Sequence, residues 1–217
     1  MSYFYALVTV FPDRRMFSTL PNKLSLLRII LSPVFYAFFV SEDPTFRHIS
    51  LGIFFIAAIT DWYDGVLARK YNTVTNIGKF LDPLADKFLT SAAFISFASL
   101  GHVEWWMVWL IIVRDLLITI LRSIAEARGA HIVTSKTAQS KTFLQMAVLY
   151  YLLLLIILRD VRWVQRSFSD EVTALLHPTV VLVLMFAVTV LTLYTGIQYL
   201  YDNRLFLRGL FAGSHTR

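Results

Sequence analysis

The stretch DWYDGVLARKYNTVTNIGKFLDPLADK, from Asp61 to Lys87, places four aspartates between long apolar segments. Burying a carboxylate in apolar surroundings costs free energy unless an opposite charge, hydrogen bonds or a metal ion compensate it. The groups that compensate these four carboxylates should therefore determine how the surrounding helices pack and what activity the protein has.

The composition is that of a membrane protein. The 217-residue chain is 57% hydrophobic and 16% charged, whereas soluble domains average about 25% charged residues. Several apolar runs reach the roughly 20 residues that a helix needs to cross a bilayer. We therefore expect an all-α polytopic membrane protein. Its six transmembrane helices are expected at about residues 22–41, 47–70, 79–100, 103–128, 138–158 and 178–201.

The first of these helices follows a segment of mixed polarity. Residues 1–20 contain aromatic and basic side chains, which predicts a juxtamembrane amphipathic helix, and no cleavable signal peptide is expected there. The six-helix domain would then occupy residues 21–202, followed by a basic cytoplasmic tail over 203–217.

The charge distribution and the cysteine content indicate the expected binding partners, the orientation in the membrane and the absence of disulfides. The formal charge is +6, but the basic residues fall between apolar segments, which favours anionic headgroups or a phosphorylated substrate over nucleic acid. Lysine and arginine mark the cytoplasmic side of membrane proteins, which predicts cytoplasmic N- and C-termini. The arginine-rich loop at 159–177 is the exception to this bias. The chain has no cysteine and so no disulfide.

The four aspartates fall on two helix faces. Only eight residues separate the two faces, so their helices are expected to be antiparallel neighbours with the carboxylates converging near the cytoplasmic ends. The first face has the spacing i, i+3, i+4, i+7 and i+8 and consists of Asp61, Asp64, Gly65, Ala68 and Arg69. The second has a spacing of four and consists of Gly78, Asp82 and Asp86.

Four convergent carboxylates repel one another, and two divalent cations with oxygen ligands are the natural compensation. The alternative is a solvated helix end at which the aspartates pair with Arg69, Lys70, Lys79 and Lys87. For the glycines the alternative is close helix packing. Two facing stripes with small residues between the carboxylates favour the metal site.

The eight spaced residues, from Asp61 to Asp86, match the signature of the CDP-alcohol phosphatidyltransferases at every position, and the chain resembles that family. The resemblance implies a homodimer of six-helix membrane domains using Mg²⁺ or Mn²⁺. It implies Asp61, Asp64 and Asp82 as metal ligands and Asp86 as the general base and a further ligand. It implies that CDP-diacylglycerol is bound by Asn22, Ser25, Gly65, Ala68, Arg69, Thr75 and Gly78.

Further cations predict a site for an acceptor's phosphate. Arg114 and Arg122 are eight residues apart and share a helix face. Cations within membrane helices are costly and usually functional, although arginines near helix ends can also extend to the headgroups. A pair between Arg114 and Asp115 is not expected, because adjacent residues diverge around a helix. The predicted phosphate-binding residues are Arg28, Arg114, Arg122, Lys136 and Lys141.

Two stretches, RDLLITILR (114–122) and SKTFLQM (140–146), are similar to phosphatidylglycerophosphate synthases, which implies glycerol 3-phosphate as the acceptor. Those enzymes commonly carry Gly-Lys-x-Lys-Thr where this chain has Ala-Gln-Ser-Lys-Thr (138–142), so the first lysine is absent. The alternative within the family is a cardiolipin synthase, whose acceptor is phosphatidylglycerol.

An alternative of another class is a membrane ion transporter that uses the aspartates as its ion site. Ion sites in transporters usually lie near the bilayer midplane in broken helices. Aspartates at helix ends favour the enzyme, located in the inner (cytoplasmic) membrane with its active site facing the cytoplasm.

Overall fold

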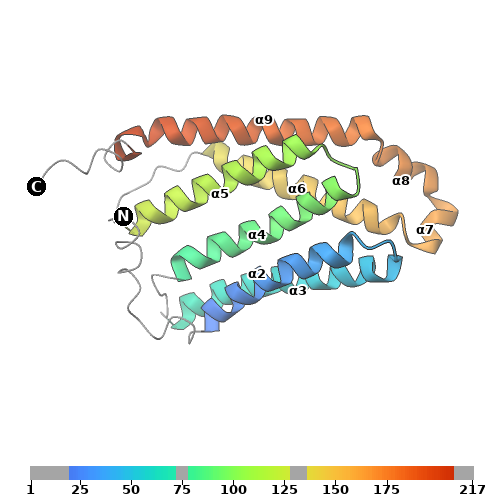
Figure 1. Cartoon of the computed structure of the whole chain (residues 1–217), viewed down its shortest axis with the longest axis horizontal. Coiled ribbons are helices and arrows are strands. Elements are labelled where there is room, and N and C mark those ends of the chain that lie inside the picture. Colours follow the sequence, from blue (N-terminus) through green and yellow to red (C-terminus); the bar gives the residue numbers. More distant parts are fainter. Residues whose placement is uncertain (1–19, 72–77, 128–135, 208–217) are drawn as a thin grey trace, which may run out of the picture.

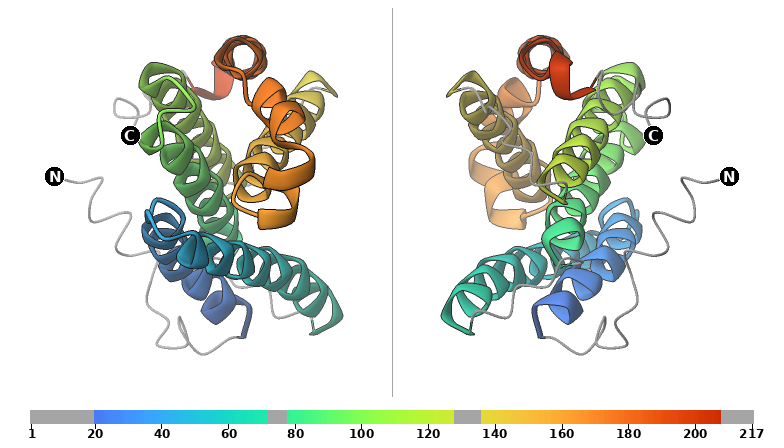
Figure 2. Two further views of the ribbon diagram at one scale, coloured as in Figure 1. Left: turned by 90° about the vertical axis from the view of Figure 1, so that its right-hand side faces the viewer. Right: turned by 90° about the vertical axis from the view of Figure 1, so that its left-hand side faces the viewer.

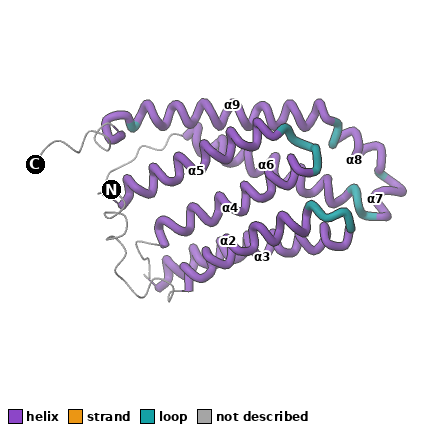
Figure 3. The backbone as a smooth tube through the Cα atoms, in the orientation of Figure 1, coloured by secondary structure: helices purple, strands orange, loops and turns teal. Residues whose placement is uncertain are grey.

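The computed structural model describes the backbone of residues 20–71, 78–127 and 136–207, and the side chains of residues 22–60, 81–126 and 137–207. This part of the chain consists of helices and short loops and contains no strand (Figure 3), which confirms the all-α class. The predicted segment at 1–20 and the tail at 203–217 fall mostly outside these residues. The long helices are α2 (Leu20–Phe39), α3 (Pro44–Tyr71), α4 (Gly78–Ser99), α5 (Trp105–Ala127), α6 (Lys136–Leu158) and α9 (Pro178–Asp202).

These helices coincide within a few residues with the six expected from hydropathy. The segment 159–177, which the sequence predicts as a loop, forms two short helices, α7 (Arg162–Ser167) and α8 (Ser169–Leu175). By length and composition, three apolar segments in the described residues are able to cross a bilayer, in agreement with a membrane protein. They are Asn22–Phe39, Thr137–Leu158 and Ser169–Asp202.

The long helices run along one common direction and reverse at each connection (Figure 1). The last turn of α3 and the first turn of α4 therefore lie at one end of the bundle, together with the end of α5 and the start of α6. We call this the aspartate end, because it carries the Asp61–Asp86 stretch. The opposite end, which carries α7 and α8, is called the far end.

Two groups of helices make up the bundle. Helix α2 packs along both α3 and α4, while α5 and α6 each pack along α9 more closely than along each other. Figure 2 shows the two groups in a view along the bundle, with α4 linking them. The expected antiparallel course of α3 and α4 is present, but α3 and α4 contact each other little and are held together mainly through α2.

Aromatic packing holds the first group together toward the far end. The ring centroids of Phe35 and Phe39 on α2 lie 5.3 Å apart, and Phe35 lies 5.3 Å from Phe54 on α3. Phe39 also meets Phe97 on α4 at 5.8 Å. All four rings are buried. Since lipid offers no hydrophobic driving force between membrane helices, close van der Waals contact of this kind has to supply the stability.

A buried ion pair closes the far end. Arg47 at the start of α3 donates from Nε to the carbonyl of Phe39 at 3.2 Å and from Nη2 to that of Ser41 at 2.9 Å. Its Nη1 donates to Oδ2 of Asp160, in the turn after α6, at 2.6 Å. The guanidinium therefore joins the α2–α3 turn to the distant α6–α7 turn.

The arginines that break the charge bias, Arg159, Arg162 and Arg166, are exposed at this end. His102 in the α4–α5 turn adds no further charge at neutral pH. Burial holds the pKa of His102 below its usual range, and the positive charges of Arg159 and Arg47 lower it further.

We expect Asp160→Ala to destabilise the protein, because it leaves the largely buried Arg47 guanidinium without its carboxylate. Removing one partner of a buried ion pair costs about 3 kcal/mol or more. Thermal unfolding in detergent measures the loss. Asp170→Ala at the same end is the control, since the Asp170 side chain is exposed and surface changes cost less than about 0.5 kcal/mol. Equal melting temperatures for the two variants would contradict a stabilising role of the Arg47–Asp160 pair.

Candidate active site

One face of α2 brings polar side chains into the bundle at the aspartate end. Asn22, Ser25 and Arg28 are spaced three residues apart, and all three are buried, with Arg28 and Ser25 fully so. The Ser25 hydroxyl donates a hydrogen bond to Oδ1 of Asp82 on α4. The Arg28 guanidinium interacts electrostatically with the same carboxylate. Asp82 is therefore held from α2 by a hydroxyl and a positive charge.

Most of the predicted signature lies beyond the side chains that the structure describes. The side chains of Asp61, Asp64, Gly65, Ala68, Arg69 and Gly78 are outside them, although their backbone belongs to α3 and α4. Thr75 lies outside the described residues altogether. The convergence of the four carboxylates thus stays a prediction, and the structure places Asp82 and Asp86 one turn apart on α4.

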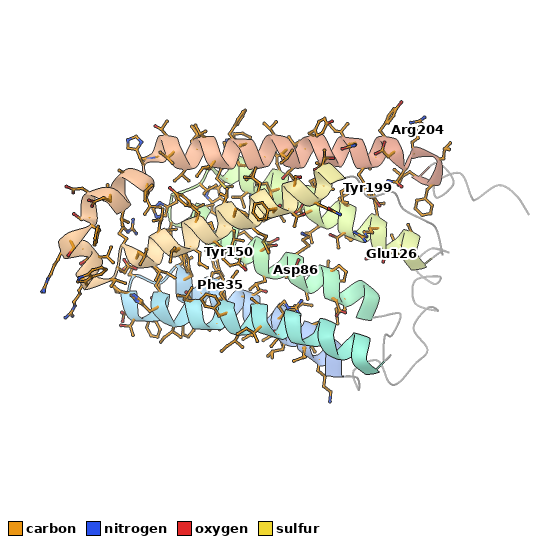
Figure 4. The ribbon with its side chains drawn as sticks, turned by 180° about the vertical axis from the view of Figure 1, so that it is seen from behind. Phe35, Asp86, Glu126, Tyr150, Tyr199 and Arg204 are labelled. Atoms are coloured by element: carbon orange, nitrogen blue, oxygen red, sulfur yellow. The ribbon has the colours of Figure 1, made fainter. Side chains whose placement is uncertain are left out.

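Asp86 lies in the interior of the bundle on α4, between its two helix groups (Figure 4). The next residue, Lys87, turns toward the second group, where its Nζ lies 3.6 Å from Oδ2 of Asp115 on α5. Consecutive side chains on a helix differ in direction by about 100°. This separation directs Asp86 and Lys87 toward different neighbours from one turn of α4.

Asp115 is the centre of a buried polar cluster. Its side chain is 4% exposed. Oδ1 accepts from Nζ of Lys141 on α6 and from Nη1 of Arg114, the latter at 3.0 Å. Oδ2 accepts from Nε2 of Gln145 on α6 at 3.1 Å. With Lys87 close to Oδ2, one carboxylate gathers donors from α4, α5 and α6.

The pair between Arg114 and Asp115 contradicts the sequence-based expectation. The Cβ atoms of the two residues point in different directions from the helix, but the arginine side chain is long enough to bring its guanidinium to the Asp115 carboxylate. Its Nη2 donates to Oγ1 of Thr195 on α9 at 2.9 Å. Its Nε, also buried, has no hydrogen-bond partner among the described residues.

A cavity of about 510 Å³ opens beside this cluster, at the aspartate end of the second helix group. Ligand sites for small molecules usually measure about 300–1,000 Å³. Most of the lining side chains are polar or charged, and the aliphatic and aromatic ones are few. The charged lining residues are Lys87, Arg114, Asp115, Arg122, Lys141 and Asp202.

The structure brings together three of the five predicted phosphate-binding residues. Arg114, Arg122 and Lys141 line this cavity. Arg122 is exposed and also pairs with Glu126 at 2.8 Å, an i, i+4 contact on α5. Arg28 instead lies beside Asp82 in the first helix group. The side chain of Lys136 lies outside the described ones.

Sequence reasoning missed several residues of this site. The sequence analysis gives Asp115 no role in the site. It indicates Lys87 only as a solvated partner of the aspartates. Gln145 and Thr195 carried no signal alone, because a polar residue in an apolar helix has many explanations. The i, i+4 spacing of Lys141 and Gln145 could have shown that both face one partner.

Arg114 fits between α5 and α9 because α9 offers small residues there. A Cβ atom added to Gly196 would lie 3.1 Å from both Cγ and Nε of Arg114. Thr192, Thr195 and Gly196 are buried on this face of α9. Small residues at such positions let membrane helices approach closely, and here the space is occupied by an arginine side chain.

Comparison with known proteins gives consistent findings. A family model described as CDP-alcohol phosphatidyltransferase matches residues 18–201. A Bacillus subtilis protein named CDP-diacylglycerol–glycerol-3-phosphate 3-phosphatidyltransferase is 40% identical over 147 residues, covering 62% of this chain and 76% of its own length. A Mycobacterium tuberculosis protein named probable phosphatidylglycerophosphate synthase is 35% identical over 189 residues, covering 86% and 82%. A relative from Blochmanniella floridana, named like the first, is 43% identical over 139 residues, covering 62% and 73%.

We expect Gly196→Ala to be less stable than Gly52→Ala by about 1–3 kcal/mol, the usual cost of overpacking a filled interior. Both substitutions gain the same helix propensity, but a Cβ at Gly52 meets nothing within 4 Å, whereas at Gly196 it presses on Arg114. The difference in melting temperature between the two variants measures the effect. A Gly196→Ala protein as stable as Gly52→Ala would show that Arg114 moves away freely.

Proposed function

Because the chain belongs to the CDP-alcohol phosphatidyltransferase family, we propose that it transfers the phosphatidyl group of CDP-diacylglycerol to glycerol 3-phosphate. The products would be phosphatidylglycerophosphate and CMP, a step of phospholipid biosynthesis. The observation that carries the choice of acceptor is the cavity lined by Arg114, Arg122 and Lys141. Three cations beside a polar cavity are suited to a phosphate group, which forms strong charge-assisted hydrogen bonds.

The lining also favours a small acceptor over phosphatidylglycerol, the acceptor of a cardiolipin synthase. A phosphate monoester carries a charge between −1.5 and −2 at neutral pH, whereas the phosphodiester of phosphatidylglycerol carries one. Two acyl chains would need a second apolar groove, but among the described lining residues the apolar contribution comes from Ile118, Ala138, Phe143 and the ring of Tyr199, and the others are polar or charged. The transporter alternative loses its support, because the family is one of transferases.

The four aspartates are proposed to hold two divalent cations, Mg²⁺ or Mn²⁺. The residues present fit such ions, since carboxylate oxygens are their preferred ligands. The Ser25 hydroxyl and the Arg28 charge hold the Asp82 carboxylate in place. When bound, such cations neutralise the diphosphate and polarise the phosphorus. Asp61, Asp64 and Asp82 are the proposed ligands, with Asp86 as a further one.

Asp86 is proposed as the general base. It would accept the proton of the acceptor hydroxyl as the hydroxyl oxygen forms its bond to phosphorus and the bond to CMP breaks. Its neighbour Lys87 lines the acceptor cavity, so one turn of α4 connects the base with that cavity. A proton acceptor is needed at this position, because the hydroxyl of glycerol 3-phosphate is uncharged at neutral pH.

The nucleotide is proposed to contact Asn22, Gly65, Ala68, Arg69, Thr75 and Gly78, with Arg69 on the diphosphate. Ser25 belongs to the same predicted set, and its bond to Asp82 adds the role of orienting that carboxylate. The aspartate end of the first helix group would thus hold the nucleotide, and the cavity of the second group would hold the acceptor.

The proposed membrane arrangement follows the six long helices. All six would cross the inner (cytoplasmic) membrane, with both termini and the aspartate end on the cytoplasmic side and the protein acting as a homodimer. Support comes from the shared orientation of the helix ends and the basic residues near them (Figure 1). This side gives CMP and glycerol 3-phosphate, both water-soluble, direct access to the site.

An acceptor screen with purified protein and labelled CDP-diacylglycerol tests the proposed function. We expect CMP release and phosphatidylglycerophosphate formation with glycerol 3-phosphate, and neither in excess chelator. Restoring Mg²⁺ or Mn²⁺ should restore the rate. Use of phosphatidylglycerol with no use of glycerol 3-phosphate would replace this acceptor by that of a cardiolipin synthase. Full activity in chelator would overturn the metal site.

Asp86→Asn should lower kcat by about 10²–10⁴-fold, the usual contribution of a general base. Binding of CDP-diacylglycerol should fall less than in Asp61→Asn or Asp64→Asn, because the main role proposed for Asp86 is proton transfer. Single-turnover rates and equilibrium binding separate the two effects. Asp170→Asn, an exposed aspartate at the far end, is the control. A near wild-type rate for Asp86→Asn would remove it as the base.

A further inference from the structure

The carboxylate of Asp115 has no place in the reaction proposed above, yet it is among the most highly connected groups of the bundle. It is 4% exposed, and four donors from three helices surround it: Lys87, Arg114, Lys141 and Gln145. Burying an ion pair costs desolvation free energy, and replacing a whole buried pair by apolar side chains is often neutral or stabilising. Such an anion beside a cavity for an anion requires an explanation.

We propose that Asp115 is a positioning residue, which holds Lys141 and Arg114 in the arrangement that binds the phosphate of the acceptor. The inference rests on the proposed function and deepens it. It names a residue that would not touch the substrate but would determine affinity for it.

The contacts divide between the two carboxylate oxygens. Oδ1 binds the ammonium of Lys141 and the Nη1 of Arg114, so one oxygen holds together cations from α6 and α5. Oδ2 binds Gln145 and lies 3.6 Å from Lys87. Since α5 and α6 pack along α9 more closely than along each other, this carboxylate is a main link between them at the level of the cavity.

Both cations keep hydrogen-bonding capacity for a ligand. An ammonium has three donors and a guanidinium five. Arg114 uses one bond from Nη1 to Asp115 and one from Nη2 to Thr195, which leaves one N–H on each of these nitrogens for a ligand. Lys141 donates to Asp115, and its side chain lines the cavity. Asp115 therefore orients these side chains without saturating them.

The charge of the described lining also suits a phosphate. Four cations, Lys87, Arg114, Arg122 and Lys141, face two carboxylates, Asp115 and Asp202, and Arg122 also pairs with Glu126. The lining therefore keeps a net positive charge with Asp115 present, so this carboxylate orders the cations without cancelling their attraction for a phosphate.

The competing explanation is that Asp115 only joins helices. A purely structural role predicts a lower melting temperature for Asp115→Asn with an unchanged KM for glycerol 3-phosphate. A purely electrostatic role predicts a lower KM, because removing an anion strengthens attraction for phosphate. The positioning role predicts the opposite sign, a higher KM, since Lys141 and Arg114 lose the group that orients them.

The experiment measures kcat and both KM values for wild type, Asp115→Asn and Asp115→Glu in detergent with Mg²⁺. For Asp115→Asn we expect KM for glycerol 3-phosphate to rise about 10–100-fold, the equivalent of losing a charge-assisted hydrogen bond. KM for CDP-diacylglycerol should stay unchanged. Asp115→Glu keeps the carboxylate and should recover part of the affinity. Asp170→Asn serves as the control variant.

A double variant covers the case in which Asp115→Asn does not fold. Asp115→Asn combined with Lys141→Gln removes the buried pair together, so the Lys141 ammonium is not left without its carboxylate. If Asp115 acts through Lys141, the double variant should have nearly the KM of Lys141→Gln alone, because the effects of coupled residues do not add. Fully additive effects would overturn the proposal.

The outcomes separate this inference from the proposed function. If the wild-type enzyme does not use glycerol 3-phosphate, the proposed function fails, and the inference with it. If the wild type uses it and Asp115→Asn shows an unchanged or lower KM, only the positioning role is overturned.

Discussion

Charges inside an apolar helix bundle have to be matched within the bundle, because water cannot screen them there. This constraint governs the half of the protein that carries chemistry. Asp115 meets three cations and an amide, and Asp82 meets the Ser25 hydroxyl and the charge of Arg28. Apart from Arg114, which shares α5 with Asp115, each of these partners comes from another helix, so the compensation of charge also fixes where those helices lie. At this end of the molecule, the pairing of buried charges and the placement of the helices therefore depend on each other.

Different kinds of contact stabilise the two ends of the bundle. Toward the far end, phenylalanine rings from α2, α3 and α4 pack together, and Arg47 joins two turns through Asp160. Toward the aspartate end, polar contacts replace the rings, and a cavity opens among them. The ring contacts and the Arg47–Asp160 pair can hold the helices together at one end, while the larger cavity keeps space for a ligand at the other. This arrangement suits a reaction between a lipid-linked nucleotide and a small phosphorylated alcohol at a membrane surface.

Helix α4 connects the two halves of the proposed site. Asp82 faces α2, Lys87 reaches toward Asp115, and Asp86 lies on the turn between them. A shift of this helix would alter the proposed metal ligands, the proposed base and the polar cavity together. In the proposed reaction, the relative position of the two substrates would therefore depend largely on this one helix, which packs against both α2 and α5.

The sequence by itself determined the all-α class, the approximate bounds of the six long helices and the spacing of the aspartate signature. These features depend on hydropathy and helical periodicity, which are properties of neighbouring residues. It also indicated one group of five cations, because cations are costly in a membrane. Of these five, Arg114, Arg122 and Lys141 line the cavity, whereas Arg28 lies beside Asp82 and the side chain of Lys136 is outside the described ones. Only the tertiary structure decided that α2 packs against both α3 and α4 and that Arg28 lies beside Asp82. It also decided that Asp115 pairs with cations that line the cavity. Such pairings depend on how helices distant in sequence pack and on how far a long side chain extends, and no local pattern contains that information.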